Sequence, residues 1–502
     1  MKKVAFEDTR SGKIGTNGAL LSASKILNLT ISLITSMLLA RFRTLEEYGT
    51  FSEINTVVNL AVAIFCIGLP SCLNYFVPRC ENQQEQDQFV SLYYVMNTAL
   101  AALTGVILIV CTPVIAWYYK NDNLIYFSYA LAIMPWANII LKSRDNILIA
   151  TNQCKRAIVL NLAQSVTGLG IIFLTQVLHQ SFSFYFILYV VEAAVFSLLV
   201  YREAFRLVKK PVWRISKKLL KEVLSYAIPL GLSSAVATLS LELDKLVVGW
   251  FYTTEDVALY ANCGKELPIA YIATSFSAVL MPVVVRNIKS GNKEYAIRKW
   301  KETIEFSMSI IAFFVAACLV FAPQMISLLY SEKYLGGTTI FRIYALVLLL
   351  RVTSFAMVLN ALGKTKIILG ISVCTLFVNV VLNIALTQLI GFSGSALATV
   401  GVILLQAYLM LHFTSKQIDI SIRNLFPWKA IAMLLGINVA GGIVVFTIVR
   451  LLRLGTDVTG ILIAVGIGIA WVILYAFFLR TRLIKLWRSM NRLEEPHEQT
   501  WR

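Results

Sequence analysis

Charged residues and histidines are scarce in this 502-residue chain. Asp, Glu, Lys and Arg together make up 14% of the residues, and there are three scattered histidines. The longest polar connection between apolar segments is about 202–221, which leaves no room for a soluble domain. The sequence therefore gives no sign of a metal cluster or of soluble enzymatic chemistry, and we expect a protein that is not an enzyme.

Cysteine patterning and a cleavable leader are absent as well. The eight cysteines include no C-x-x-C pair, which disfavours a redox or metal site, and we expect them to be packing residues. The first apolar stretch contains Lys25 and has no small-residue cleavage site. We therefore expect it to be a retained span rather than a signal peptide.

Hydrophobic residues, in contrast, make up 58% of the chain. Apolar stretches of about 20 residues are long enough to cross roughly 30 Å of hydrocarbon. They recur along the whole sequence and predict an all-α polytopic membrane protein of about fourteen transmembrane helices. The predicted spans are 17–40, 52–77, 89–116, 124–150, 157–177, 182–201, 222–251, 258–285, 303–329, 338–361, 367–388, 391–413, 428–449 and 458–479.

The net charge of +18 follows this predicted topology. With the amino terminus inside, thirty-two of the 45 Lys and Arg residues fall in cytoplasmic segments and six in outward loops, while seven lie within spans. Such an asymmetry is a positive-inside signal, and an even number of spans places both termini in the cytoplasm. The basic charge therefore indicates anionic lipid headgroups as neighbours rather than nucleic acid.

The chain also repeats itself at an offset of 209–210 residues. Thr44 aligns with Thr253, Glu47 with Asp256 and, farther on, Pro113 with Pro323. Each copy holds six spans, so the two bundles share one orientation and are expected to surround a central cavity, as in alternating-access transporters. The predicted parts are a first bundle at 1–206, a basic linker at 207–221, a second bundle at 222–415, two additional helices at 416–480 and a basic tail at 481–502.

Charged side chains occur inside the predicted spans. A charge there costs at least about 2.5–3.5 kcal/mol, so such groups normally face a bundle interior or a water-filled cavity. Acidic residues, among them Glu53 and Asp145, lie nearby. This pattern favours a transporter. The seven cations are Lys25, Lys142, Arg144, Lys245, Lys265, Arg342 and Arg351.

Two predicted helices carry small or polar residues at spacings of three and four, which places them on one helix face. The stripe in 222–251 contains Gly231, Ser234, Thr238, Glu242, Lys245 and Gly249. The stripe in 17–40 contains Lys25, Asn28, Ser32 and Thr35. These faces line either the central cavity or close helix contacts. If Glu242 and Lys245 pair across one turn, that pair is structural and the remaining cations bind anions.

Three further acids are candidates for coupling to a proton or sodium ion. They are Glu192, Asp244 and Glu266. For Glu192, a hydrogen bond to a neighbouring helix is the alternative. Glu266 follows Lys265 and precedes Pro268, which permits a bend in the span. No cofactor is expected beyond such an ion.

The sequence resembles the multidrug/oligosaccharidyl-lipid/polysaccharide exporter superfamily over about residues 15–415. Within it, the chain is most similar to bacterial polysaccharide transporters of the Wzx type, the lipid-linked oligosaccharide flippases. The stretches that carry the likeness are 39–41 to 49–51, Tyr226–Gly231 with Asp244–Gly249, and 321–323 to Tyr334.

This resemblance implies a cationic cavity that accepts an undecaprenyl-pyrophosphate-linked oligosaccharide at the bacterial inner membrane. Implied partners are this lipid-linked oligosaccharide and membrane lipids, with a polysaccharide polymerase and a chain-length regulator as further candidates. A pyrophosphate attracts Lys and Arg strongly in a low-dielectric cleft. The expected substrate contacts are Lys25, Asn28, Ser32, Ser234, Thr238, Glu242, Lys245, Lys265 and Arg351.

Other functions remain open at this point. A peptidoglycan-precursor flippase of the same superfamily would have cavity arginines, whereas the first span here offers only Lys25. A drug/cation antiporter would need an acidic, aromatic cavity, whereas the intramembrane cations outnumber the acids. A glycosyltransferase or polymerase would need a catalytic acid on a sizeable outward loop, and a scaffold would not need buried charge in both halves.

Overall fold

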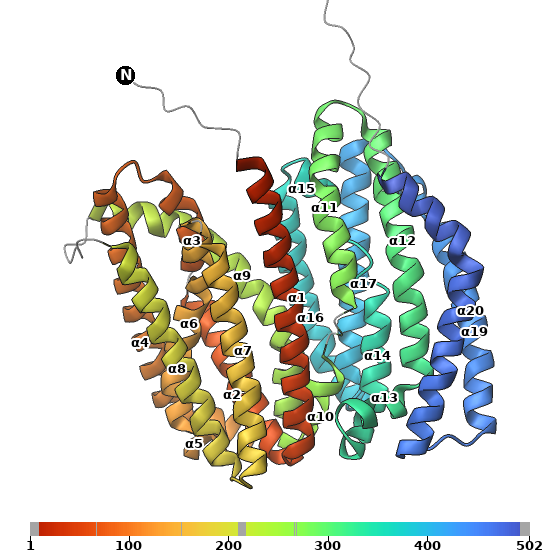
Figure 1. Cartoon of the computed structure of the whole chain (residues 1–502), viewed down its shortest axis with the longest axis horizontal. Helices are drawn as coiled ribbons and strands as arrows, with labels where there is room; N and C mark the ends of the chain where they lie inside the picture. The colour runs from red at the N-terminus through yellow and green to blue at the C-terminus, as the bar shows by residue number, and fades with distance from the viewer. Residues whose placement is uncertain are drawn as a thin grey trace, which may run out of the picture. The chain divides into compact units, whose positions relative to one another are not determined.

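The computed structural model describes residues 10–66, 68–151, 153–208, 217–265, 267 and 269–491 (Figure 1). All regular secondary structure in these residues is helical. The chain divides into two compact units, Met1–Ala261 (unit 1) and Asn262–Arg502 (unit 2).

Unit 1 holds nearly all of the first ten α-helices. They are α1 (Arg10–Phe42), α2 (Leu45–Phe65), α3 (Leu69–Phe76) with the 3₁₀ turn η1 (Val77–Arg79), α4 (Gln83–Tyr119), α5 (Asn123–Tyr126), α6 (Ser128–Ala150), α7 (Cys154–Val177), α8 (Phe182–Leu207), α9 (Lys217–Phe251) and α10 (Thr254–Cys263), whose last two residues belong to unit 2.

Unit 2 holds the other ten. They are α11 (Ala270–Lys289), α12 (Lys293–Val320), α13 (Ala322–Leu329) with the 3₁₀ helix η2 (Glu332–Gly337), α14 (Thr338–Leu348), α15 (Met357–Ala361), α16 (Thr365–Ile390), α17 (Gly394–Ile418), α18 (Ile422–Leu425), α19 (Trp428–Leu451) and α20 (Val458–Asn491).

The prediction of an all-α polytopic membrane protein is confirmed. Each of the fourteen predicted spans falls on one or more helices. Within the described part of the chain, nine helices are individually long and apolar enough to cross a bilayer, or ten if the bent pair α2–α3 counts as one span. Of the other four predicted spans, 17–40 lies in α1 and 124–150 in α5 and α6, whereas 258–285 and 338–361 coincide with the interrupted pairs α10–α11 and α14–α15. The boundaries of the two predicted bundles, and the cavity between them, stay predictions.

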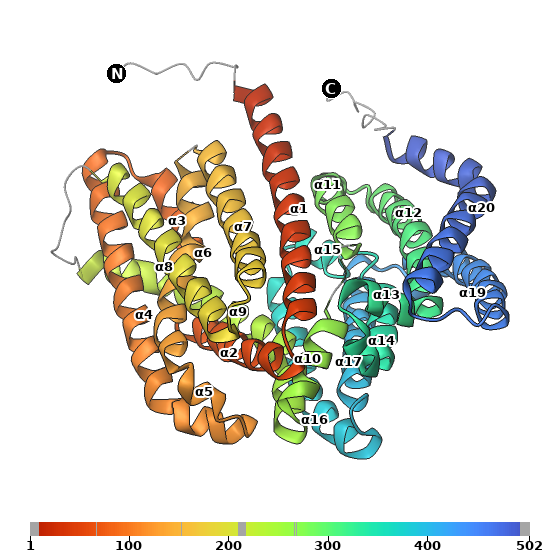
Figure 2. The same cartoon turned by 60° about the horizontal axis from the view of Figure 1, so that its bottom comes forward.

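The core of unit 1 lies where α3, α4, α6, α8 and α9 meet. Tyr93 of α4 and Ile140 of α6 are fully buried there, and Tyr226 of α9 stacks on Tyr75 of α3. Figure 2 shows α3, α4, α6 and α8 in orange to yellow and α9 in yellow-green. The chain bends between α2 and α3, where Gly68 has a φ of +70°. A Cβ at Gly68 would lie 2.5 Å from the backbone nitrogen of Gly231, so this glycine permits the close approach of α9.

The core of unit 2 includes a cluster that joins α12 and α13 to the last two helices. Phe321 and Trp471 are its largest buried members, and the ring of Phe313 contacts that of Trp471. Both α19 and α20 pack against α12. The last two helices, which lie outside the sequence repeat, are therefore an integral part of this unit.

Candidate functional site

Glu242 in unit 1 is held by two helices. Its carboxylate, on α9, accepts hydrogen bonds from Thr56 (3.3 Å) and Asn59 (3.1 Å) of α2. It also pairs with Lys245 one turn later on α9. The Glu242 side chain is 11% exposed and that of Lys245 26% exposed. The pairing anticipated from the spacing is thus present, and it neutralises Lys245 at least in part.

Two more carboxylates of unit 1 are buried near this pair. Glu53 of α2 accepts a hydrogen bond of 2.7 Å from Asn121, which also donates to Thr50 (2.9 Å). Asp244 of α9 accepts one of 3.1 Å from the Tyr260 hydroxyl of α10. These bonds engage one carboxylate oxygen of each acid and tie α2, α9, α10 and the turn after α4 together.

The residues of the stripe predicted on 222–251 have different surroundings at different points of the helix. Gly231 meets Gly68, and a Cβ at Gly249 would lie 2.2 Å from the Tyr119 ring, so both glycines serve close helix contacts. Ser234 is exposed on the surface of unit 1 and Thr238 is half-buried. The stripe thus combines helix packing at both ends with exposed polar side chains between them.

Glu192 lies on α8 against α7. It is 8% exposed, and a Cβ at Gly168 of α7 would lie 3.4 Å from its Oε2 atom. No hydrogen bond joins its carboxylate to any residue within the described ranges, so the interhelical hydrogen bond considered above is not present there.

One turn away from Gly168 on α7, the Ser165 hydroxyl donates to the Asn28 side chain of α1 (3.0 Å). Ser32, one turn farther along α1, is exposed in unit 1.

A second polar connection joins α6 to α7. Arg144 donates to Gln164 (2.6 Å) and lies 3.7 Å from Asp145, which accepts from Asn161 (2.8 Å). Every one of these groups has a protein partner. Arg144 and Asp145 therefore connect α6 to α7.

In unit 2, two predicted substrate contacts lie where membrane helices are interrupted. Lys265 follows the end of α10 at Cys263 and precedes α11, which begins at Ala270. Arg351 follows the end of α14 at Leu348 and precedes α15, which begins at Met357. Non-helical backbone at membrane depth is tolerated only where it is buried in protein or lines a water-filled cavity.

These two interruptions belong to neighbouring spans. The helices that follow them, α11 and α15, contact each other. The second interruption is fixed by Thr353, which accepts a hydrogen bond of 2.8 Å from the buried Trp300 indole of α12. Arg351 is half-buried, and Lys265 is partly exposed. We take this pair of interruptions as the candidate anion site of unit 2.

The remaining predicted cations and acids fall in different places. Arg342 of α14 donates to the Leu319 carbonyl of α12 (3.2 Å). Lys25 lies in α1 but its side chain is outside the described part of the structure, and Glu266 also lies outside the described residues. In the residues that are described, no group of three His, Cys, Asp or Glu side chains could hold a metal ion.

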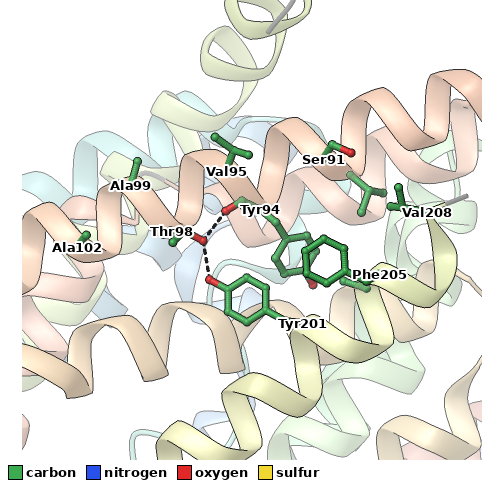
Figure 3. A pocket seen from close by; sticks show the side chains of 11 residues that line it. Ser91, Tyr94, Val95, Thr98, Ala99, Ala102, Tyr201, Phe205 and Val208 are labelled. Carbon is green, nitrogen blue, oxygen red and sulfur yellow. Dashed lines mark hydrogen bonds between the residues drawn. The ribbon is translucent and has the colours of Figure 1, made fainter. Parts of the chain in front are cut away.

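An apolar groove of about 480 Å³ opens between α4 and α8 of unit 1 (Figure 3). Its walls include Val95, Phe205 and Val208. The Thr98 hydroxyl donates to the Tyr94 carbonyl (2.7 Å) and bonds to the Tyr201 hydroxyl (2.5 Å). The groove therefore suits hydrocarbon and offers little to a charged headgroup.

The chain has the fold of known membrane transporters. It matches the structure described as "Lipid II flippase MurJ, inward closed conformation" with a TM-score of 0.70, over 93% of this chain and 100% of that one, at 16% identity. A multidrug resistance MATE family transporter of the MOP superfamily, in its inward-facing conformation, matches with a TM-score of 0.62, over 78% of this chain and 94% of that one, at 14% identity.

Sequence comparison finds two relatives and a family. Two uncharacterised membrane proteins of Methanocaldococcus jannaschii are each 22% identical to the chain, over 397 and 377 residues. The alignments cover 74% and 70% of this chain, and 78% and 86% of theirs. The profile of the family described as "Polysaccharide biosynthesis protein" matches residues 38–339, which is more than half of the chain. This multi-pass membrane protein therefore belongs to the polysaccharide biosynthesis protein family.

Proposed function

We propose that the protein is a flippase that moves an undecaprenyl-pyrophosphate-linked oligosaccharide across the bacterial inner membrane by alternating access. The glycan is a repeat unit of a surface polysaccharide, an O-antigen or an exopolysaccharide. Membership of a polysaccharide biosynthesis family and a transporter fold support this proposal. In it, both termini are cytoplasmic, and the pyrophosphate head crosses while the lipid tail stays in the bilayer.

The observation that carries the proposal is the position of Lys265 and Arg351 in two interrupted spans. A pyrophosphate is a multiply charged anion, and charge-assisted hydrogen bonds to it are strong where water is scarce. An interrupted span also brings backbone polar groups to membrane depth, where a hydrated or charged substrate can use them. Lys265 and Arg351 therefore bind the pyrophosphate in this scheme.

The other predicted contacts have secondary roles. Lys245 is engaged with Glu242, so that pair is structural, and Lys25 is a further proposed contact for the anion. Asn28, Ser32, Ser234 and Thr238 are assigned to sugar hydroxyls. Ser234 and Ser32 are exposed within unit 1, as such contacts require.

Glu192 is the coupling residue in this scheme, ahead of Asp244 and Glu266. A buried carboxylate in a span is costly unless it is protonated or neutralised. Asp244 already accepts a hydrogen bond from Tyr260, whereas Glu192 has no such bond within the described residues. Proton or sodium binding to Glu192 would therefore alter the energy of one conformation relative to the other.

The decisive experiment is depletion of the protein in its host, followed by measurement of lipid-linked glycan in each leaflet. We expect accumulation on the inner leaflet and loss of surface polysaccharide. Arrest of cell-wall synthesis with surface polysaccharide intact would instead indicate a peptidoglycan-precursor flippase. Altered toxin sensitivity with intact surface glycan would indicate a drug/cation antiporter. Either of the last two outcomes contradicts the proposal.

A further inference from the structure

A strongly basic pocket of about 680 Å³ lies in unit 2 between the first turns of α12 and the last turns of α20. Figure 1 shows α12 in green and α20 in dark blue, and the two helices contact each other. Five cations and one acid line the pocket. They are Arg298, Lys299, Arg480, Lys485, Arg488 and Glu302.

The acid does not balance these cations. Glu302 lies 3.4 Å from Lys299, whose side chain is 8% exposed and also donates to the Ser489 carbonyl. Lys299 thus holds α12 and α20 together at the floor of the pocket. Arg480, Lys485 and Arg488 are exposed, and no carboxylate in the described part of the chain forms an ion pair with them. The pocket therefore keeps an excess of positive charge.

The neighbouring turn of α20 shows a different arrangement. Arg482 donates to Glu305 of α12 at 2.6 Å, so that cation is neutralised by a partly buried acid. The excess charge is therefore confined to the pocket and is not a general property of this helix pair.

The length of α20 places the pocket at the edge of the bilayer. Its 34 residues extend about 51 Å at 1.5 Å per residue, well beyond the roughly 30 Å of hydrocarbon. The side chains change along the helix accordingly. Phe477 and Phe478 are 60% and 78% exposed, and the exposed cations Arg480, Lys485 and Arg488 follow them, with Ile484 49% exposed between the first two. An apolar face that leads into a cationic pocket matches a lipid, with acyl chains below and phosphate above.

We propose that this pocket binds the phosphate headgroup of an anionic membrane lipid. The lipid phosphate contacts Arg480, Lys485 and Arg488, while its acyl chains lie along the exposed apolar face of α20. The site is separate from the interruptions that hold Lys265 and Arg351, and it does not depend on the proposed transport function.

The test is a lipid titration of the purified full chain, followed by native mass spectrometry. The probes are phosphatidylglycerol and the zwitterionic phosphatidylcholine. The variant Arg480→Gln/Lys485→Gln/Arg488→Gln should bind phosphatidylglycerol at least about tenfold more weakly than the unaltered chain, because each cation near an anionic headgroup contributes to binding. A matched control, Lys416→Gln/Arg423→Gln/Lys429→Gln, removes three other exposed cations of unit 2 and should change the affinity less than about twofold.

Two further measurements separate the alternatives. Arg480→Lys/Arg488→Lys keeps the charges and should retain most of the affinity; its loss would contradict a charge-based site. Inorganic pyrophosphate should not displace the lipid from the unaltered chain at comparable concentration; displacement would mean that a soluble phosphate is the occupant. Equal affinity for both lipids, or equal affinity of the pocket variant and the control, would overturn the proposal. None of these readouts involves transport.

Discussion

The two copies of the sequence repeat begin alike and then diverge. In unit 1, Thr44 and Glu47 form a capping box at the start of α2. At the start of α10, Thr253 and Asp256 make the same reciprocal bonds, with Asp256 in place of the glutamate. The equivalence predicted from a 209-residue offset thus recurs as the same local geometry. The two helices then differ in length, since α2 has 21 residues and α10 has ten.

The two copies differ at positions that carry a charge or bind a charged side chain. Thr56 of α2 donates to Glu242, and its equivalent at the same offset is Lys265, which lies beyond the end of α10. Buried Glu53 likewise corresponds to buried Asn262. Unit 1 therefore uses this stretch to satisfy buried acids, whereas unit 2 ends the helix and presents a cation. The two copies therefore share the same helix start but differ in the charged residues that come after it.

The largest expected effect is on the cations of unit 2. Arg351→Gln should reduce the translocation rate at least about tenfold, because a charge-assisted hydrogen bond to an anion is worth about 1.5–3 kcal/mol. The measurement is flipping of lipid-linked glycan in proteoliposomes, with protein abundance in the membrane determined in parallel. Lys364→Gln, at an exposed turn of the same unit, is the matched control and should be silent. Normal flipping by the Arg351 variant would remove this residue from the site.

Substitution of a hydrogen-bonded acid in unit 1 should affect the stability of the protein more than its transport rate. Glu242→Ala removes the acceptor for Thr56 and Asn59 and leaves Lys245 without its partner, so we expect a loss of about 2–4 kcal/mol in the free energy of unfolding. Thermal unfolding in detergent measures it. The double variant Glu242→Ala/Lys245→Ala should recover part of the loss. Additive losses would show that the two side chains are not coupled.

Glu192→Gln tests whether Glu192 differs from the other buried acids of unit 1. Glu192 is assigned to ion coupling, whereas the others stabilise the fold. Because no hydrogen bond of the described chain is lost, stability should fall by less than about 1 kcal/mol. Transport, in contrast, should lose its dependence on an imposed proton or sodium gradient. The comparison is made with Asp244→Asn, which weakens the bond from Tyr260. Undiminished gradient dependence of the Glu192 variant would assign coupling elsewhere.

Composition and spacing were sufficient to predict the helices and part of the charge pairing. Runs of apolar residues determine the spans because the bilayer core accepts little else. The Glu242–Lys245 pair was visible as an alternative because both residues lie on one helix at a spacing of three. Pro268 likewise indicated a bend beside Lys265. These features are all local in sequence.

Contacts between different helices could not be predicted from composition and spacing. Nothing near Arg351 in sequence signals an interrupted helix, since the stretch contains no proline. The bonds from Asn121 to Glu53 and from Thr56 to Glu242 join residues 68 and 186 positions apart. A single sequence gives the spacing on each helix but not the rotation of one helix against another. Glu53 was therefore noted only as a nearby acid, and its partner Asn121 was missed.

A smaller effect is expected at the close helix contact of unit 1. Gly249→Ala would place a Cβ 2.2 Å from the Tyr119 ring, and the displacement of that buried ring should cost about 1–3 kcal/mol. Thermal unfolding again measures the change. The control is Gly436→Ala in α19, where a Cβ meets nothing within 4 Å and helix propensity favours alanine by up to about 1 kcal/mol. Equal stability of the two variants would show that the α4–α9 contact tolerates a shift.

The smallest expected effect tests whether the two helix starts are energetically equivalent. Thr44→Ala and Thr253→Ala each remove a side-chain acceptor for the amide three residues later, at 3.1 and 3.2 Å. The loss of such a cap costs about 0.5–2 kcal/mol, and the matching geometry predicts nearly the same value for both.

The consequences of the two cap variants should nevertheless differ. Because α2 continues for 21 residues and carries the partners of Glu242, fraying there weakens unit 1 as a whole. The ten-residue α10 leads directly to Lys265, so its loss of order should lower the transport rate more than the unfolding temperature. Equal changes in both quantities for the two variants would show that the copies still share one role, and the contrast between the units would then be one of sequence only.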